Sequence, residues 1–105
     1  MRQKNENPIF DSRSAILCEH TASKEFPILR AIRDEPLDDV DSGWQFLCNT
    51  EKNEDINNAQ IWAVGEILEV EPSLSNLLEN PPGTELIRDN RNEMWKIIKF
   101  SKDIL

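Results

Sequence analysis

Residues 41–48 read Asp-Ser-Gly-Trp-Gln-Phe-Leu-Cys, and this stretch decides the fold. Its large apolar side chains, Trp44 and Phe46, alternate with smaller or polar residues, as in a strand with one buried face. Gly43 directly precedes the alternation, and glycine adopts the positive φ that a sharp turn requires. We therefore expect a turn followed by a strand over 44–48.

Apolar runs on either side of this stretch predict further strands. They cover residues 15–18, 28–33, 84–88 and 94–98, and the last two are expected to form a hairpin around the loop 89–93. Residues 28–33 also fit a helical turn, because a short apolar run does not separate the two periodicities. Residues 49–58 are polar and fit a loop or a short helix, whereas 61–68 predict a strand that leads into a short helix.

A helix is expected after Pro72, with Ser73 as its cap and three leucines on one face: Leu74, Leu77 and Leu78. The run Pro81-Pro82-Gly83 ends this helix and is typical of a type II turn. Strands dominate, so the predicted class is α+β, with a mostly antiparallel sheet and one or two short helices. We expect one small domain over residues 1–105, with residues 1–8 frayed.

The composition excludes several classes of function. The chain has 105 residues and a net charge of −8, which argues against binding to nucleic-acid phosphates or to an anionic membrane. No apolar run approaches the roughly 20 residues of a membrane span, and the first residues lack the apolar stretch of a secretory signal. With two separated cysteines, the sequence predicts a cytoplasmic protein with reduced thiols.

The negative charge is concentrated in the middle of the chain. Residues 34–85 contain thirteen acidic residues and one basic residue, a net charge of −12, whereas residues 1–33 and 86–105 each carry +2. Such a block either keeps a small protein soluble or forms a docking surface for a basic partner. Because acidic surfaces repel one another, we expect a monomer or at most a weak homodimer.

The sequence supports no metal site and no cofactor. The acids around Asp38–Asp41 lack the ligand spacing of a calcium loop, and one histidine with two isolated cysteines does not complete a zinc site. Cys18 and His20 would share one face of a strand, so a thiolate–imidazole pair is conceivable there. The simpler interpretation makes Cys18 a small core residue and His20 a surface residue, and we expect no enzymatic activity.

Two blocks of sequence match a known pattern. Residues 33–36 read R-D-E-P, and after a short acidic spacer residues 41–46 read D-S-G-W-Q-F. Further on, P-S-L at 72–74 and paired leucines at 77–78 precede P-P-G-T-E-L-I-R-D at 81–89. The two blocks resemble the immunity protein 33-like domain of bacterial polymorphic-toxin systems, formerly a domain of unknown function.

The resemblance covers roughly residues 15–98. It implies an α+β domain that binds and neutralises a cognate toxin, or a relative of such domains with another binding role. The chain departs from the family pattern after the central strand, where the family carries more glycine and acid than Asn49–Asp55 provides. A partner recognised by this run would therefore differ.

The leading hypothesis is an immunity-type protein that covers a basic toxin surface with acidic residues. The predicted partner-binding residues are Asp34, Glu35, Asp38, Asp39, Asp41 and Trp44, with Glu51, Glu54 and Asp55 as a second patch. Trp44 is included because an aromatic residue beside carboxylates is typical of an interface anchor, although it also fits the core. Trp62 is expected to be buried.

Other motif residues fit structural roles: Arg33, Ser42, Gly43, Gly83 and Arg88. Asp41 or Ser42 could accept hydrogen bonds from the turn, and Arg33 or Arg88 could pair with Asp41 or Glu35. Two alternatives to the leading hypothesis remain open. One is a regulatory interaction module without a toxin, and the other is an enzyme that uses Cys18 and His20.

Overall fold

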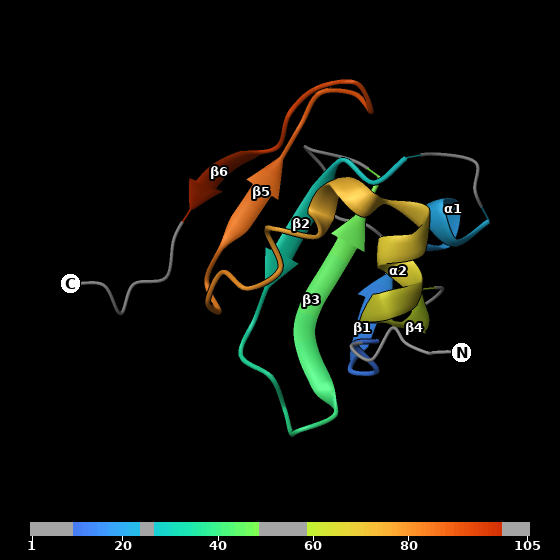
Figure 1. The fold of residues 1–105 in the computed structure, drawn as a ribbon, viewed down its shortest axis with the longest axis vertical. Helices are drawn as coiled ribbons and strands as arrows, with labels where there is room; N and C mark the ends of the chain where they lie inside the picture. The colour runs from blue at the N-terminus through green and yellow to red at the C-terminus, as the bar shows by residue number, and fades with distance from the viewer. Residues whose placement is uncertain (1–9, 24–26, 49–58, 100–105) are drawn as a thin grey trace, which may run out of the picture.

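The computed structural model describes residues 10–23, 27–48 and 59–99, and the expectations for 1–8 and 49–58 lie outside these ranges. Figure 1 shows a single twisted sheet with the helix Val64–Val70 and the turns that follow it lying in front of the sheet. The elements, in chain order, are β1 (Ser14–Leu17), α1 (Glu19–Ala22), β2 (Arg30–Arg33), β3 (Asp41–Leu47), β4 (Gln60–Ala63), α2 (Val64–Val70), the 3-10 helix η2 (Pro72–Leu74), β5 (Glu85–Ile87) and β6 (Lys96–Lys99).

The described strands form one six-stranded sheet in the order β4-β1-β3-β2-β5-β6. Four of its five pairings are antiparallel, including the expected β5–β6 hairpin, whereas β1 and β3 run parallel. The predicted α+β class with a mostly antiparallel sheet is therefore confirmed. Because β1 and β3 run parallel, their C-terminal ends lie side by side at the same end of the sheet.

The core lies between the sheet and the segment from α2 to residue 78 (Figure 1). Alternation along β3 directs Trp44 and Phe46 to the covered face, where they stack with ring centroids 5.9 Å apart. The other buried apolar residues of this core are Ala15, Leu17, Ile28, Ala31, Val64, Ile67, Leu74, Leu78 and Leu86. Gln45 lies on the opposite face and is half-buried, beside Ile16 and Ile32 in the strand register.

Several predicted elements are confirmed, and others need correction. Residues 30–33 form a strand and not a helical turn, and β4 leads directly into α2 as expected. The central strand, however, begins at Asp41 and not at Trp44. The short helix α1 was not predicted, because its four residues carry neither an apolar period nor a capping side chain.

The expected helix after Pro72 is wrong. The segment forms η2 and then further turns, in which the N–H of Ser75, Leu77 and Asn80 each donates to the carbonyl three residues earlier. Ser73 does not cap a helix, because its hydroxyl donates to the Glu71 carboxylate and accepts from the Trp95 indole. The predicted apolar side is nevertheless correct, since Leu74 and Leu78 are buried.

The Pro81–Thr84 turn has the expected geometry. The Thr84 N–H donates to the Pro81 carbonyl over 3.2 Å, and Gly83 at the third position has φ +98°. Positive φ at this position is the requirement of a type II turn. In the part of the chain that is described, no helix combines the length and apolar character needed to cross a membrane.

Candidate functional site

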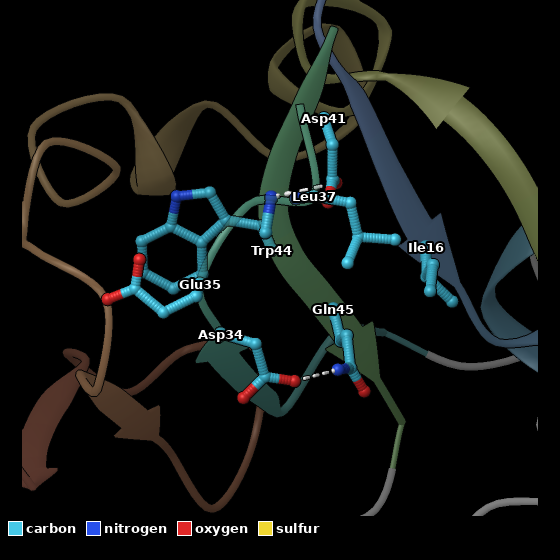
Figure 2. Close-up of a pocket in the computed structure, with 8 residues that line it drawn as sticks. Ile16, Asp34, Glu35, Leu37, Asp41, Trp44 and Gln45 are labelled. Atoms are coloured by element: carbon cyan, nitrogen blue, oxygen red, sulfur yellow. Dashed lines mark hydrogen bonds between the residues drawn. The ribbon is translucent and has the colours of Figure 1, made fainter. Parts of the chain in front are cut away.

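The segment 34–41, which we call the acidic loop, connects β2 to β3 and carries five carboxylates. It borders a pocket of about 180 Å³ on the face of the sheet opposite the core. Figure 2 shows the side chains of Ile16 and Gln45 at this pocket, with Leu37 turned toward Ile16. The remaining lining residues are Asp34, Glu35, Asp41, Gly43 and Trp44.

Asp41 holds the acidic loop in shape. One carboxylate oxygen accepts the main-chain N–H of Leu37 over 2.8 Å, and the other accepts the N–H of Gly43 over 2.9 Å. These two hydrogen bonds lower the pKa of Asp41 below its usual value, because they favour the charged carboxylate. Asp41 therefore uses both of its oxygens within the loop, which is a structural role.

Gly43 brings the two ends of the acidic loop together. Its φ is +82°, and its carbonyl accepts the N–H of Asp34 over 2.8 Å. A Cβ atom at this position would overlap the Asp34 carbonyl oxygen. The close backbone approach explains why glycine stands here in the D-S-G-W motif. Ser42 continues the same local network, because its hydroxyl accepts the N–H of Trp44 over 3.1 Å.

Arg33 supports the loop from the covered side of the sheet. Its guanidinium donates to the carbonyls of Ser42 over 2.9 Å and Asn80 over 2.8 Å, and lies 5.8 Å from the centre of the Trp44 ring. Burial lowers the pKa of Arg33, although the group stays charged. The expected ion pair between Arg33 and Asp41 or Glu35 is therefore replaced by bonds to main-chain carbonyls.

The structure removes Trp44 from the candidate binding surface. The residue is 1% exposed, and its indole N–H donates to the Leu78 carbonyl over 3.1 Å. The expectation that Trp44 anchors a partner is corrected, because a fully packed indole presents no surface. Trp62, expected to be buried, is only half-buried.

Four carboxylates of the acidic loop are exposed: Asp34, Glu35, Asp38 and Asp39. Asp34 accepts a hydrogen bond from the Gln45 side-chain amide, as Figure 2 shows, and Asp38 accepts the N–H of Val40 over 3.0 Å. Within the described ranges the ion pairs are Arg13–Asp11, Arg30–Glu85 and Arg88–Glu71. None of them neutralises the acidic loop, so its negative charge faces the solvent.

Two apolar residues of the loop were missed as candidates. Leu37 is 90% exposed and Val40 is 68% exposed, each with acidic residues close by in sequence. An apolar core with a charged rim is the usual arrangement of a protein interface. The signal was present in the sequence, because an apolar residue inside a run of acids has no obvious place in a core.

The second block of the motif also has structural contacts. Arg88 is 2% exposed and donates to the Glu71 carboxylate over 2.8 Å and to the Ile28 carbonyl over 3.0 Å. Its guanidinium also lies over the Trp95 ring, 4.4 Å from the ring centre. The suggested pairing of Arg88 with Asp41 or Glu35 is therefore wrong. The Gly83 N–H donates to the Arg33 carbonyl over 2.7 Å.

A second group of reactive side chains lies at the other end of β3. Ligand atoms of Cys18, His20 and Cys48 are all within 4.8 Å of one another. The two cysteines, which are isolated in the sequence, are therefore neighbours in the fold, together with the histidine. The other predicted residues, Glu51, Glu54 and Asp55, lie outside the described residues.

Comparison with known proteins gives one family. The model of the immunity protein Imm33 domain matches residues 16–99, which is most of the chain. The match contains the acidic loop, the second motif block and the cysteine–histidine group. No curated protein and no solved structure matches the chain.

Proposed function

Since this chain belongs to the Imm33 immunity protein domain family, we propose that it neutralises a cognate protein toxin by binding it through the acidic loop. Membership of the family supports an immunity role. The exposed acidic loop supports the choice of this surface as the one that binds the toxin. The observation that carries the proposal is the juxtaposition of four exposed carboxylates with the exposed side chains of Leu37 and Val40.

Charge favours a basic surface on the toxin. The exposed carboxylates of the acidic loop have no ion pair within the described chain, so their field extends outward. Complementary fields speed up diffusional encounter and disfavour acidic partners. Enzymes that act on nucleic acids carry basic clefts, and covering such a cleft would block its substrate.

The loop is held ready for binding before a partner arrives. The Asp41 carboxylate accepts the N–H groups of Leu37 and Gly43, the Gly43 carbonyl holds the two ends of the loop together, and Arg33 donates to the backbone from the covered side of the sheet. A surface fixed in advance loses less conformational entropy when it binds. This division assigns Asp41, Gly43 and Arg33 to shaping the loop, and the exposed residues to contact.

The test is capture of the partner from a lysate of the native source with tagged protein. Three forms are compared: the wild type, the double variant Asp38→Lys/Asp39→Lys, and the control Glu69→Lys/Glu93→Lys. The control changes the net charge by the same amount at exposed positions outside the acidic loop. The captured protein is then purified, and its association rate is measured at low salt and at about 0.5 M salt.

We expect one dominant basic toxin whose activity the wild type inhibits. Its association should slow at least tenfold with the loop variant at low salt, and the control should keep most of the wild-type rate. High salt should reduce the difference, because screening shortens the range of charge interactions. Equal rates for the loop variant and the control would contradict the role of the acidic loop. A partner without toxic activity would instead favour a regulatory interaction module.

A further inference from the structure

Cys18, His20 and Cys48 form a compact group of metal-binding side chains. The Cys48 Sγ atom lies 3.8 Å from His20 Nδ1, and one ligand atom from each of the three residues lies within 4.8 Å of the others. Cys18 is buried, Cys48 is half-buried and His20 is exposed, so the group opens toward solvent on the histidine side.

The topology of the sheet creates this group. Cys18 directly follows β1 and Cys48 directly follows β3, and the two strands run parallel with Leu17 opposite Phe46. The Cys18 N–H donates to the Phe46 carbonyl over 3.0 Å, which continues the pairing beyond the end of β1. The chain then turns into α1, and this turn places the imidazole of His20 against Cys48.

We propose that Cys18, His20 and Cys48 bind a zinc ion, with a water molecule as the fourth ligand. Zinc binds thiolate sulfur at about 2.3 Å and imidazole nitrogen at about 2.1 Å in tetrahedral geometry. These bond lengths place a sulfur and a nitrogen ligand roughly 3.6 Å apart. The observed separation of 3.8 Å between Cys48 Sγ and His20 Nδ1 therefore needs little adjustment.

The chemistry of the donors agrees with zinc. Two thiolates and one neutral imidazole balance the charge of a divalent cation, and the two thiol protons pass to solvent on binding. Thiolate ligands select zinc over the hard cations calcium and magnesium. The Cys18 thiol donates to the Thr21 hydroxyl over 3.4 Å. Once zinc binding has removed the thiol proton, this hydroxyl can donate to the thiolate as an outer-shell partner.

The zinc group is separate from the acidic loop. The acidic loop ends at Asp41, the first residue of β3, whereas Cys48 follows the last residue of this strand. In Figure 1 α1 and the loop lie near opposite ends of β3. A bound ion would join the ends of β1, α1 and β3. Zinc bound only by the folded chain would stabilise it by mass action.

The test is titration of the reduced, chelator-treated 105-residue chain with zinc, monitored by calorimetry. Thermal unfolding is then compared with and without zinc. Cobalt(II) serves as a spectroscopic probe, because thiolate ligation gives a sulfur-to-cobalt charge-transfer band and tetrahedral geometry gives intense visible bands. The variants are His20→Gln and Cys48→Ser, neither of which changes a fully buried side chain. Glu19→Gln is the matched control, an exposed residue of α1 outside the group.

We expect one zinc ion per chain, a higher melting temperature with zinc, and both cobalt signatures. Each ligand variant should lose more affinity than the roughly 10- to 100-fold that the loss of an outer-shell partner costs. Glu19→Gln should bind as the wild type does. Absence of zinc binding by the reduced protein would overturn the proposal, as would binding that survives His20→Gln and Cys48→Ser, or an octahedral cobalt spectrum without charge transfer.

Discussion

The indole N–H of Trp44 donates to the main-chain carbonyl of Leu78 over 3.1 Å. This hydrogen bond joins the centre of the sheet to the turns that follow η2. Both residues are buried, so water does not replace the bond if it is lost. Trp44 therefore holds the turns after η2, which cover the core, against β3.

Replacing Trp44 by Phe should destabilise the fold by about 2 kcal/mol or more. The smaller ring leaves a cavity, and the Leu78 carbonyl loses its donor in a buried position. Chemical denaturation of wild type and variant measures this difference. Partner affinity of the folded variant should stay close to that of the wild type, because Trp44 has no exposed surface. A large loss of affinity at unchanged stability would contradict this structural role.

Alanine substitutions at Gly43 and Gly65 should lower the free energy of unfolding by very different amounts. At Gly43 the new Cβ meets the Asp34 backbone and the residue has φ +82°, so we expect a loss of at least about 1–3 kcal/mol. At Gly65 the Cβ meets the ring of Phe10, a half-exposed side chain that can move, and alanine is a better helix former. Gly65→Ala should stay within about 1 kcal/mol of wild type. Equal melting temperatures for the two variants would contradict this account.

Asp41 should make stability depend on pH in the acidic range. Its pKa is lowered in the folded state by the N–H groups of Leu37 and Gly43, so the charged form stabilises the fold. This contribution is complete above the unfolded pKa of about 3.9 and is lost as the pH falls through the lower folded value.

Asp41→Asn isolates this contribution. At neutral pH the variant should be less stable by under about 1 kcal/mol, because solvent screens the carboxylate of this half-buried residue. The difference in free energy of unfolding between wild type and variant should become smaller below about pH 4. Denaturant midpoints measured across the acidic range check this, and a gap that widens toward low pH would contradict the assigned hydrogen bonds.

The parts of the fold that the sequence predicted depend on local chemistry. Alternation at Trp44 and Phe46 predicts a strand with one buried face, and the residue types around Gly83 predict its turn. The parallel pairing of β1 with β3 joins segments far apart in the chain, and no local signal reports it. Each of these strands ends at a leucine that a cysteine directly follows, and the parallel pairing brings the two cysteines together.

In the candidate site, too, the sequence predicts the local features but not those that depend on contacts between distant segments. The acidic run around Asp38 was visible in the sequence, but whether Trp44 faces solvent depends on which side of β3 the turns after η2 cover. The exposure of Leu37 likewise depends on the folded loop, in which the Asp41 carboxylate accepts the Leu37 main-chain N–H. Contacts of this kind appear only once the segments are brought together.

Leu37 and Val40 should act on the lifetime of the toxin complex. Apolar side chains at the centre of an interface slow dissociation, whereas charges at the rim mainly change association. The double variant Leu37→Ser/Val40→Ser should therefore dissociate at least tenfold faster, at a nearly unchanged association rate. Stability should change by less than about 0.5 kcal/mol, because both side chains are exposed in the free protein.

The matched control for this prediction is Ile61→Ser/Met94→Ser. These residues are 70% and 85% exposed, close to the 68% of Val40 and the 90% of Leu37, but they lie on β4 and just before β6. Dissociation rates measured by surface plasmon resonance with the purified toxin compare the two double variants directly. Faster dissociation only in the loop variant would place the apolar centre of the interface at Leu37 and Val40. Equal rates for the two variants would show that the toxin contacts a different face, because general surface hydrophobicity is the same in both.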